Sequence, residues 1–323
     1  MSAAFEVLPS RKQDSPEWHE QRRQGIGASD VAGILGLSPW ATPLSIFEQK
    51  MGVPNEIDES LAWFGHALEP VVADWVAAKH PEVGPIGAGY SARSLQWPWL
   101  TAAPDRVVER DDLIVPVELK TSSAFSLATW EAGIPLYYAA QVQAQMAVLG
   151  APHGWLAVLH GGNHPELHGP IERDEEFIQD ELVPRTRAFW EDHVLVQVPP
   201  EPMTTGEAVR IWPGDPDLDA VEADDLLLEQ WKALIDARRY EKTYGADAAR
   251  LALEIQKALG DATELRFGDQ VLATWKPQAG ARRLDTTLLK QDHPDLVAAY
   301  TRQGEAGRRF LPKEPKPRKD TAA

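Results

Sequence analysis

The chain has 323 residues, 43% of them hydrophobic, which is enough for one core of about 200 residues and an appended part. It has no cysteine, which excludes disulfides, thiolate catalysis and cysteine-ligated metals. No apolar run of about 18 residues and no secretory signal stand out, so we expect an intracellular, cytoplasmic protein without membrane contact. The formal net charge of −17 argues against a nucleic-acid partner, because phosphates need clustered Lys and Arg.

Proline and glycine divide the first two thirds of the chain into blocks. Apolar spacing predicts the following elements in chain order. They are two short helices within 18–52, a helix over 62–79, a strand over 99–103, a hairpin of 106–109 and 113–120, a helix over 136–149, a buried strand over 154–160 and a helix over 174–193.

The last third has a different composition. A proline-rich stretch, 197–219, predicts a linker between a core domain, 1–196, and an extension of helices and a hairpin, 220–312. Within the extension we expect one long helix over 220–259 or two helices broken near Gly245, then a hairpin and a final helix. The long helix is either a coiled-coil arm or folded back on its own core. A basic, disordered tail, 313–323, ends the chain.

The candidate chemistry lies near Asp105, Glu118 and Lys120. Glu118 and Lys120 are two residues apart on an expected strand, so their side chains share a face, and Asp105 lies at the end of the neighbouring strand. Oxygen ligands suit a hard divalent cation such as Mg²⁺, which can polarise a phosphodiester. Glu69 could supply a third carboxylate from the preceding helix, and Gln141 could hold water or the lysine from the following one. A glutamate two residues before a lysine is by itself a weak signal, since most such charges are solvated.

Five blocks of sequence, in a fixed order between about residues 15 and 195, are more specific. They are WHEQRRQGIGASD (18–30) with ILGLSPW (34–40), GHALEP (65–70), APD (103–105), ELK (118–120) and YAAQVQ (138–143). Together they resemble the YqaJ-type viral recombinases, relatives of bacteriophage lambda exonuclease in the PD-(D/E)xK nuclease superfamily. The resemblance implies an α/β fold: a restriction-endonuclease-like core with a mixed central sheet flanked by helices, followed by a helical C-terminal extension.

The resemblance also implies roles for the acidic cluster. Asp105, Glu118 and the carbonyl of Leu119 would be metal ligands, and Lys120 would be the catalytic lysine. Glu69 would be the helix carboxylate that acts on the metal directly or through water. The implied cofactor is Mg²⁺ or Mn²⁺, bound as two ions.

Three further residues match the family pattern. Gln141 matches the glutamine of the family's Q-V-Q helix, and Arg22 with Ser29 matches the pair that holds a DNA 5′ phosphate. Two positions depart from the lambda-type pattern. Ala103 replaces a serine before the proline–aspartate pair, and 121–125 lack a further arginine, so the implied phosphate pocket has fewer donors.

The implied activity is hydrolysis of DNA from duplex ends, which leaves a single strand for recombination in the cytoplasm of a bacterial host. Implied partners are double-stranded DNA, further copies of the chain in a trimeric ring, and a single-strand annealing protein. Arg22, Arg23, Arg93 and Lys120 could line a basic channel while the exterior stays acidic. Two alternatives stay open: a structure-specific or nicking endonuclease of the same superfamily, and a non-catalytic DNA-binding assembly module.

Two other groups of side chains have less specific patterns. Trp40 is a candidate for stacking on DNA bases, whereas Trp63 is expected in the core. His160, His164 and His168 recur at four-residue steps, which on a helix is typical of a zinc site. Glycines and a proline between them rule out a helix, so we expect a solvated loop.

Overall fold

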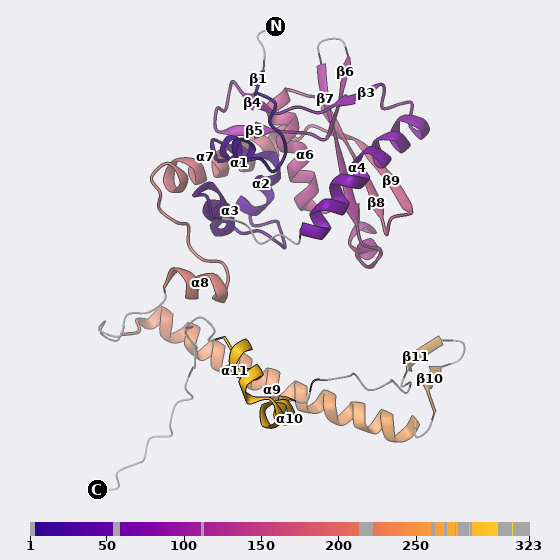
Figure 1. Ribbon diagram of the computed structural model, residues 1–323, viewed down its shortest axis with the longest axis vertical. Coiled ribbons are helices and arrows are strands. Elements are labelled where there is room, and N and C mark those ends of the chain that lie inside the picture. Colours follow the sequence, from indigo (N-terminus) through magenta and orange to yellow (C-terminus); the bar gives the residue numbers. More distant parts are fainter. Residues whose placement is uncertain are drawn as a thin grey trace. The chain divides into compact units, whose positions relative to one another are not determined.

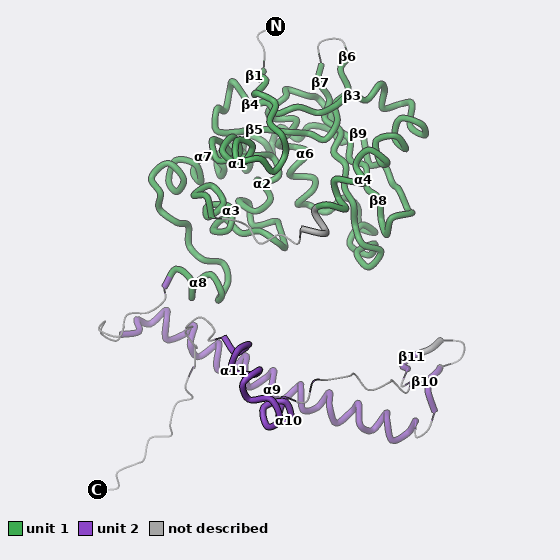
Figure 2. The backbone as a smooth tube through the Cα atoms, viewed as in Figure 1, with its two compact units in different colours: residues 1–211 green, residues 212–323 purple. Residues whose placement is uncertain are grey.

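Figure 1 shows the computed structural model of the chain. The residues it describes are 4–53, 59–110, 113–212, 222–259, 262–267, 270–274, 276, 284, 286–302 and 312. The chain divides into two compact units, residues 1–211 and residues 212–323 (Figure 2). Residues 213–219 of the expected linker and the expected tail, 313–323, lie outside the described residues.

The first unit is built around a five-stranded sheet in the order β3-β6-β7-β8-β9 (Figure 1). Its strands are β3 (Ile86–Ala88), β6 (Arg106–Arg110), β7 (Leu113–Ser122), β8 (His153–His160) and β9 (His164–Glu172). The pair β7–β8 is parallel and the other pairs are antiparallel. Because parallel neighbours need a crossover, α6 (Leu136–Leu149) follows β7 and returns the chain to β8. The expected mixed sheet flanked by helices is confirmed.

A four-stranded sheet in the order β1-β4-β5-β2 completes the first unit with the remaining helices. Its strands are β1 (Phe5–Val7), β2 (Ile26–Gly27), β4 (Ala92–Ser94) and β5 (Leu100–Ala102). The helices are α1 (Pro16–Arg23), α2 (Ala28–Ile34), α3 (Pro43–Lys50), α4 (Glu59–Lys79), α5 (Leu127–Trp130), α7 (Val183–Phe189) and α8 (Thr205–Ile211). Turns of π-helix, Phe177–Leu182 and Trp190–Val194, flank α7, and a short 3₁₀-helix, Ala124–Ser126, precedes α5.

Residues 18–52 contain three short helices, where two were expected, because each helix has its own start signal. Ser15 caps α1 by accepting a hydrogen bond from the Trp18 amide at 3.2 Å. Thr42 caps α3 in the same way through the Ser45 amide at 3.1 Å. The helix between them, α2, begins at a capping box in which Asp30 accepts from the Gly27 amide at 2.9 Å.

The two faces of the five-stranded sheet pack on different helices because side chains alternate along a strand. On one face, Val117 and Leu119 of β7 belong to an apolar cluster with Val76 of α4. On the other face, Leu156 and Val158 of β8 belong to the larger core that contains α2 and α6. In the parallel register these two residues are level with residues 118 and 120 of β7. Glu118 and Lys120 of β7 therefore direct their side chains toward α6.

The expected loop around the three histidines is wrong. His160 ends β8, and His164 and His168 lie on β9, which pairs antiparallel with β8. Gly161 and Gly162 have φ angles of 56° and 79°. Consecutive residues with positive φ close a tight hairpin turn, so the glycines that break a helix here build a turn between two strands.

Helix α8 lies within the range that was expected to be a linker. Glu207 is its buried residue, and its carboxylate accepts hydrogen bonds from Thr42 Oγ1 and from the amides of Met203 (2.8 Å) and Thr204 (3.2 Å). Arg210 forms an ion pair with Glu48 of α3 at 3.1 Å. These contacts join α8 to the N-terminal helices of the first unit.

The second unit contains one long helix and a hairpin. Its elements are α9 (Asp225–Leu259), β10 (Glu264–Phe267), β11 (Gln270–Thr274), α10 (Thr286–Asp292) and α11 (Pro294–Tyr300). The long helix runs through Gly245 without a break. The single last helix that was expected is divided, because Pro294 disfavours helical backbone at His293. In the part of the chain that the structure describes, no helix is long and apolar enough to span a bilayer.

Candidate active site

Asp105 and Glu118 meet at the point where β6 begins beside β7. Arg106, the first residue of β6, pairs with Val117 of β7. This register places Asp105 next to the residues that follow Val117, and its Oδ2 accepts a hydrogen bond from the Leu119 amide at 2.8 Å. The two strands thus bring together two carboxylates that are thirteen positions apart in the sequence.

The backbone of Gly89 packs closely against the backbone of Pro104 and Asp105. Gly89 follows β3, and its amide donates to the Asp105 carbonyl at 3.2 Å. A Cβ atom at Gly89 would lie 1.7 Å from the Pro104 carbonyl oxygen, closer than any side chain allows. The backbone of the Pro104–Asp105 pair therefore depends on a residue without a side chain at position 89.

Glu118 is 2% exposed and accepts hydrogen bonds on both carboxylate oxygens. Its Oε1 accepts from Lys120 Nζ at 2.5 Å and from Gln141 Nε2 at 2.5 Å. Its Oε2 accepts from Gln145 Nε2 at 2.6 Å. A buried carboxylate needs such donors, because leaving it unpaired in the core would cost several kcal/mol.

Lys120 lies beside Glu118 on the face of β7 that is directed toward α6. Its ammonium group is 5.7 Å from the ring centre of Tyr138, which adds a cation–π contact. Burial works to lower the pKa of Lys120, but Glu118 and Asp105 outweigh it and raise that pKa to about 12. The lysine is therefore a permanent ammonium donor at neutral pH.

The carboxylates of this cluster repel one another. Burial and the neighbouring charge of Glu118 raise the pKa of Asp105 to about 8, against the opposing effect of Lys120. Burial also raises the pKa of Glu69, on α4; His66 and Arg106 oppose this, and Glu118 adds to it. The acidic groups are thus close enough to interact, and one ammonium group does not neutralise them.

Arg22 of α1 and Ser29 of α2, the pair that the family resemblance assigns to one phosphate site, lie next to each other. Arg22 Nη2 lies 3.3 Å from Ser29 Oγ and 3.3 Å from Asp30 Oδ1. Its guanidinium group also lies over the Trp18 ring, 4.8 Å from the ring centre. These contacts hold the side chain with its remaining N–H donors available to an anion.

Asp30 and Lys50 were not predicted as part of any site, yet they support this arginine. Asp30 is 3% exposed, and Lys50 Nζ donates to its Oδ2 at 2.6 Å and to the Arg22 carbonyl at 2.9 Å. Burial works to raise the pKa of Asp30, but Lys50, Arg22 and the Gly27 amide outweigh it and hold that pKa below its usual value. The sequence signal for Asp30 was its place at the end of the block 18–30, whereas Lys50 lies outside all five blocks.

A single cavity of about 970 Å³ joins the two clusters. Every residue that was predicted for the site lines it: Arg22, Ser29, Glu69, Asp105, Glu118, Leu119, Lys120 and Gln141. Of the expected basic channel, Arg22, Arg23 and Lys120 also line the cavity. Arg93 instead donates to the Gln24 carbonyl at 3.4 Å and lies 3.7 Å from Glu6.

The donor set fits a hard cation in chemistry but does not form a closed cage. Among the described residues, no three or more His, Cys, Asp or Glu side chains are grouped so that they could hold a metal ion by themselves. Magnesium is commonly bound by one or two carboxylates with water and substrate phosphate completing its shell. Asp105 and Glu118, with the Leu119 carbonyl, offer oxygen donors of that kind.

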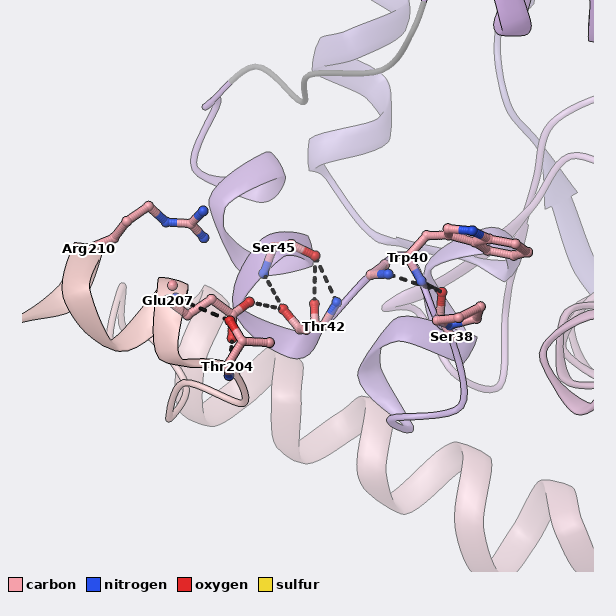
Figure 3. A pocket seen from close by; sticks show the side chains of 10 residues that line it. Ser38, Trp40, Thr42, Ser45, Thr204, Glu207 and Arg210 are labelled. Carbon is pink, nitrogen blue, oxygen red and sulfur yellow. Dashed lines mark hydrogen bonds between the residues drawn. The ribbon is translucent and has the colours of Figure 1, made fainter. Parts of the chain in front are cut away.

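A second cavity, of about 320 Å³, contains none of the predicted catalytic residues, but it borders Trp40, the candidate for stacking on DNA bases (Figure 3). Figure 3 shows the side chains that line it, among them Glu207, which is hydrogen-bonded to Thr42 and Thr204. Trp40 is 72% exposed and contacts Tyr137 edge to face at 4.9 Å between ring centres. Trp63, expected in the core, is 64% exposed, so that expectation is wrong.

The three histidines surround one carboxylate on the β8–β9 hairpin. Their Nε2 atoms lie 3.8 Å (His160), 3.2 Å (His164) and 3.5 Å (His168) from the oxygens of Glu166. Trp130 stacks on His168 and contacts His160 edge to face. In the described chain this group is likewise not arranged to hold a metal ion.

Comparison with known proteins places the chain in a family. The model of the YqaJ-like viral recombinase domain matches residues 17–152. The uncharacterized protein YqaJ of Bacillus subtilis (strain 168) is 32% identical over 324 residues, covering 97% of this chain and 99% of that protein. Among solved structures, the alkaline exonuclease LHK-Exo of Laribacter hongkongensis is 20% identical with a TM-score of 0.46, over 57% of this chain and 94% of its own. A phage-related exonuclease of Haemophilus somnus is 12% identical with a TM-score of 0.40, over 56% and 99%.

The fold and site define an α/β protein whose mixed sheet carries a partly buried acid–acid–lysine cluster at a strand junction. The chain belongs to the YqaJ-like viral recombinase family.

Proposed function

We propose that this protein is a divalent-metal-dependent DNA exonuclease that degrades one strand from duplex ends. The observation that carries the proposal is the meeting of Asp105, Glu118 and Lys120 in one cavity, with carboxylates that repel each other. Such repulsion is relieved by a bound cation, and perturbed acids in a cavity are a common mark of a catalytic site. Membership of the YqaJ-like family supports this choice over other metal-dependent chemistries.

Asp105, Glu118 and the Leu119 carbonyl would hold the cation, Mg²⁺ or Mn²⁺, and a second ion would share these ligands. Glu69, half-buried at the edge of the cavity, would act through water. When bound, such ions polarise a phosphodiester and provide hydroxide from water at neutral pH. Binding would require Glu118 to give up at least one of the donors that now pair with it.

The remaining residues would position the DNA and stabilise its charge. Lys120, as a fixed ammonium, neutralises the charge that develops on the phosphate oxygens. Gln141 holds Lys120's partner, Glu118, in place. Arg22 and Ser29, across the same cavity, would bind the 5′ phosphate of the strand end, since a guanidinium group can contact two phosphate oxygens at once.

Duplex DNA ends would be the substrate, and the product would be a single strand for an annealing protein during recombination. The family resemblance supports a ring-like trimer as the active assembly. The low number of cations in the cavity predicts a shallow salt dependence of DNA binding, whereas binding with no salt dependence at all would argue against phosphate contacts.

The test is digestion of an end-labelled duplex, with and without a 5′ phosphate, in Mg²⁺ and in a chelator. We expect mononucleotides and a shortened labelled strand only with Mg²⁺, with faster digestion of the phosphorylated end. Covalently closed circular DNA should stay intact; cutting of the circle would favour the endonuclease alternative. Absence of any metal-dependent cleavage, with binding of DNA retained, would favour the non-catalytic module.

The Glu118→Ala protein is the matched negative control for that assay. It should retain the fold by circular dichroism. It should lose cleavage, because the change removes a cation ligand and leaves the DNA-binding residues in place. Cleavage by Glu118→Ala at the parental rate would remove this cluster from the mechanism.

A further inference from the structure

Gln145 is a buried glutamine in the middle of α6 that no prediction assigned to the site. Gln145 is 1% exposed. Its helix neighbours Ala144, Met146 and Val148 form part of the apolar core. Burying an amide in such surroundings costs free energy unless the amide is hydrogen-bonded. The hydrogen bonds of Gln145 therefore indicate what the residue does.

One end of the Gln145 amide contacts the proposed metal ligand. Its Nε2 donates to Glu118 Oε2 at 2.6 Å. An ionised carboxylate can only accept hydrogen bonds, so the amide must present its NH₂ group to Glu118. Lys120 and Gln141 both donate to the other oxygen, Oε1. Among the described side chains, Gln145 is thus the one donor to Oε2.

The carbonyl oxygen at the other end of the Gln145 amide makes no hydrogen bond within the described residues. Gln145 Oε1 is buried and has no hydrogen-bond partner among the described residues, and Gln145 lines the large cavity. A glutamine kept only for stability would be expected to pair both of its polar ends. The half-satisfied amide indicates that contact with Glu118 is the reason for its position.

Gln143, two residues earlier on the same helix, shows the contrasting case. It is 8% exposed, its Nε2 donates to the Glu172 carbonyl at 2.8 Å, and its Oε1 accepts from the Asp174 amide at 2.9 Å. Both ends of this amide are paired with backbone at the end of β9. Gln143 is therefore a structural glutamine that makes no hydrogen bond to Glu118. It offers a matched control for Gln145.

We propose that Gln145 is a positioning residue that fixes the carboxylate of Glu118 in the orientation needed to bind a divalent cation. This inference rests on the proposed function. Without Gln145, Oε2 would lose its hydrogen-bond donor, and the carboxylate would be oriented only through Oε1 by Lys120 and Gln141. Groups that orient a metal ligand from behind commonly change metal affinity 10- to 100-fold when they are removed.

The test compares Gln145→Met with Gln143→Met in the full-length protein, because methionine keeps the length of glutamine and removes its hydrogen bonds. Mn²⁺ binding is measured by calorimetry without DNA, and cleavage of duplex DNA is measured across a range of Mn²⁺ concentrations. We expect Gln145→Met to raise the Mn²⁺ dissociation constant about 10-fold or more, with kcat recovering toward the parental value at saturating Mn²⁺. Gln143→Met should keep the dissociation constant within about twofold while it lowers the thermal unfolding midpoint.

A purely structural role for Gln145 predicts the opposite pattern: a lower unfolding midpoint and unchanged Mn²⁺ affinity. That result, in a parent protein that binds Mn²⁺ and cleaves DNA, would overturn the inference and leave the proposed function intact. A parent protein that neither binds Mn²⁺ nor cleaves duplex DNA would overturn both. Should Gln145→Met be too unstable to titrate, Gln145→Asn serves instead, since its shorter amide cannot reach Oε2 and the same rise is expected.

Discussion

Two buried carboxylates in the same cavity have opposite electrostatic surroundings. Asp30 is 3% exposed and Glu118 is 2% exposed. Asp30 is paired with Lys50 and Arg22 and accepts a backbone hydrogen bond, and its pKa lies below the usual value. Glu118 also has donors, but it lies beside Asp105, whose pKa burial and Glu118 together raise to about 8.

A structural acid and a functional acid differ in how far the neighbouring charges compensate them. A buried carboxylate whose charge is fully compensated by fixed cations and amides contributes to the fold and has nothing left to bind. A group of acids that exceeds its cations stays in repulsion until a further positive charge arrives. Burial alone does not distinguish the two; the balance of charge around each acid does.

The largest expected effect follows from replacing the lysine of the functional cluster. Lys120→Met should lower the rate of DNA cleavage about 10³-fold, about 4 kcal/mol of transition-state stabilisation, because it removes the ammonium group that faces the phosphate. The free energy of unfolding should fall by about 1–3 kcal/mol, because Glu118 loses its cationic partner but keeps both of its glutamine donors, and Lys120 lies partly exposed at the cavity. Single-turnover cleavage at saturating Mg²⁺ and urea unfolding measure the two quantities.

The matched substitution in the structural cluster is Lys50→Met, and its effect should fall on stability. It leaves Asp30 buried with only Arg22 as a cationic partner, which is expected to cost about 3–5 kcal/mol. Urea unfolding with hydrogen exchange of the α2 and α3 amides measures the loss where it occurs. Equal stability losses for the two lysine variants would contradict the distinction between the clusters.

Much of the scaffold could be predicted from sequence because its patterns are long. The hairpin of β6 and β7 and the helix α6 were predicted close to their observed bounds, and Glu118 with Lys120 was expected on one face. Strands β1, β3 and β4 were not predicted, since each has three residues and no alternation can be recognised over that length. Such strands form because neighbouring strands offer partners, which is information from the tertiary structure.

The supporting residues of the site could not be predicted for a similar reason. Gln145 and Gln143 look alike in the sequence, and only the packing of α6 on β7 directs one to Glu118 and the other to backbone. Lys50 lies twenty residues from Asp30, and the turn between α2 and α3 decides that they meet. Sequence blocks identified the residues that carry chemistry, whereas the residues that orient them emerged from contacts.

A smaller effect is expected where the two clusters face each other across the cavity. Arg22→Ala should reduce the preference for 5′-phosphorylated ends about 10-fold, roughly 1.4 kcal/mol, because it removes the proposed phosphate donor. The change should appear in KM for phosphorylated duplex and leave the rate on unphosphorylated ends nearly unchanged. Digestion of matched duplexes that differ only in the 5′ phosphate measures it.

Lys242→Ala is a suitable control for Arg22→Ala, since Lys242 is an exposed cation on α9 in the second unit. It should leave the 5′-phosphate preference as in the parent. An equal loss of activity on both kinds of end after Arg22→Ala would instead mean that Arg22 serves the fold through Asp30.

The smallest expected effect concerns the response of the structural acid to pH. Asp30 has a lower pKa in the folded protein than in the unfolded chain, so its carboxylate form stabilises the fold above about pH 4. This stabilisation is lost as the pH falls through the folded-state pKa, because the unfolded chain binds the proton first. Asp30→Asn removes that proton exchange and should make the decline of unfolding free energy in acid shallower, by up to about 1.4 kcal/mol per pH unit.

The measurement is urea unfolding between about pH 5 and pH 2, the range in which carboxylates titrate. Asp192→Asn, which changes an exposed carboxylate, should follow the parent curve. An unchanged acid slope in Asp30→Asn would mean that Asp30 exchanges its proton equally in both states. The pairing with Lys50 and Arg22 would then add no net charge stabilisation, and the contrast between a compensated acid and a repelled one would rest on Asp105 and Glu118 alone.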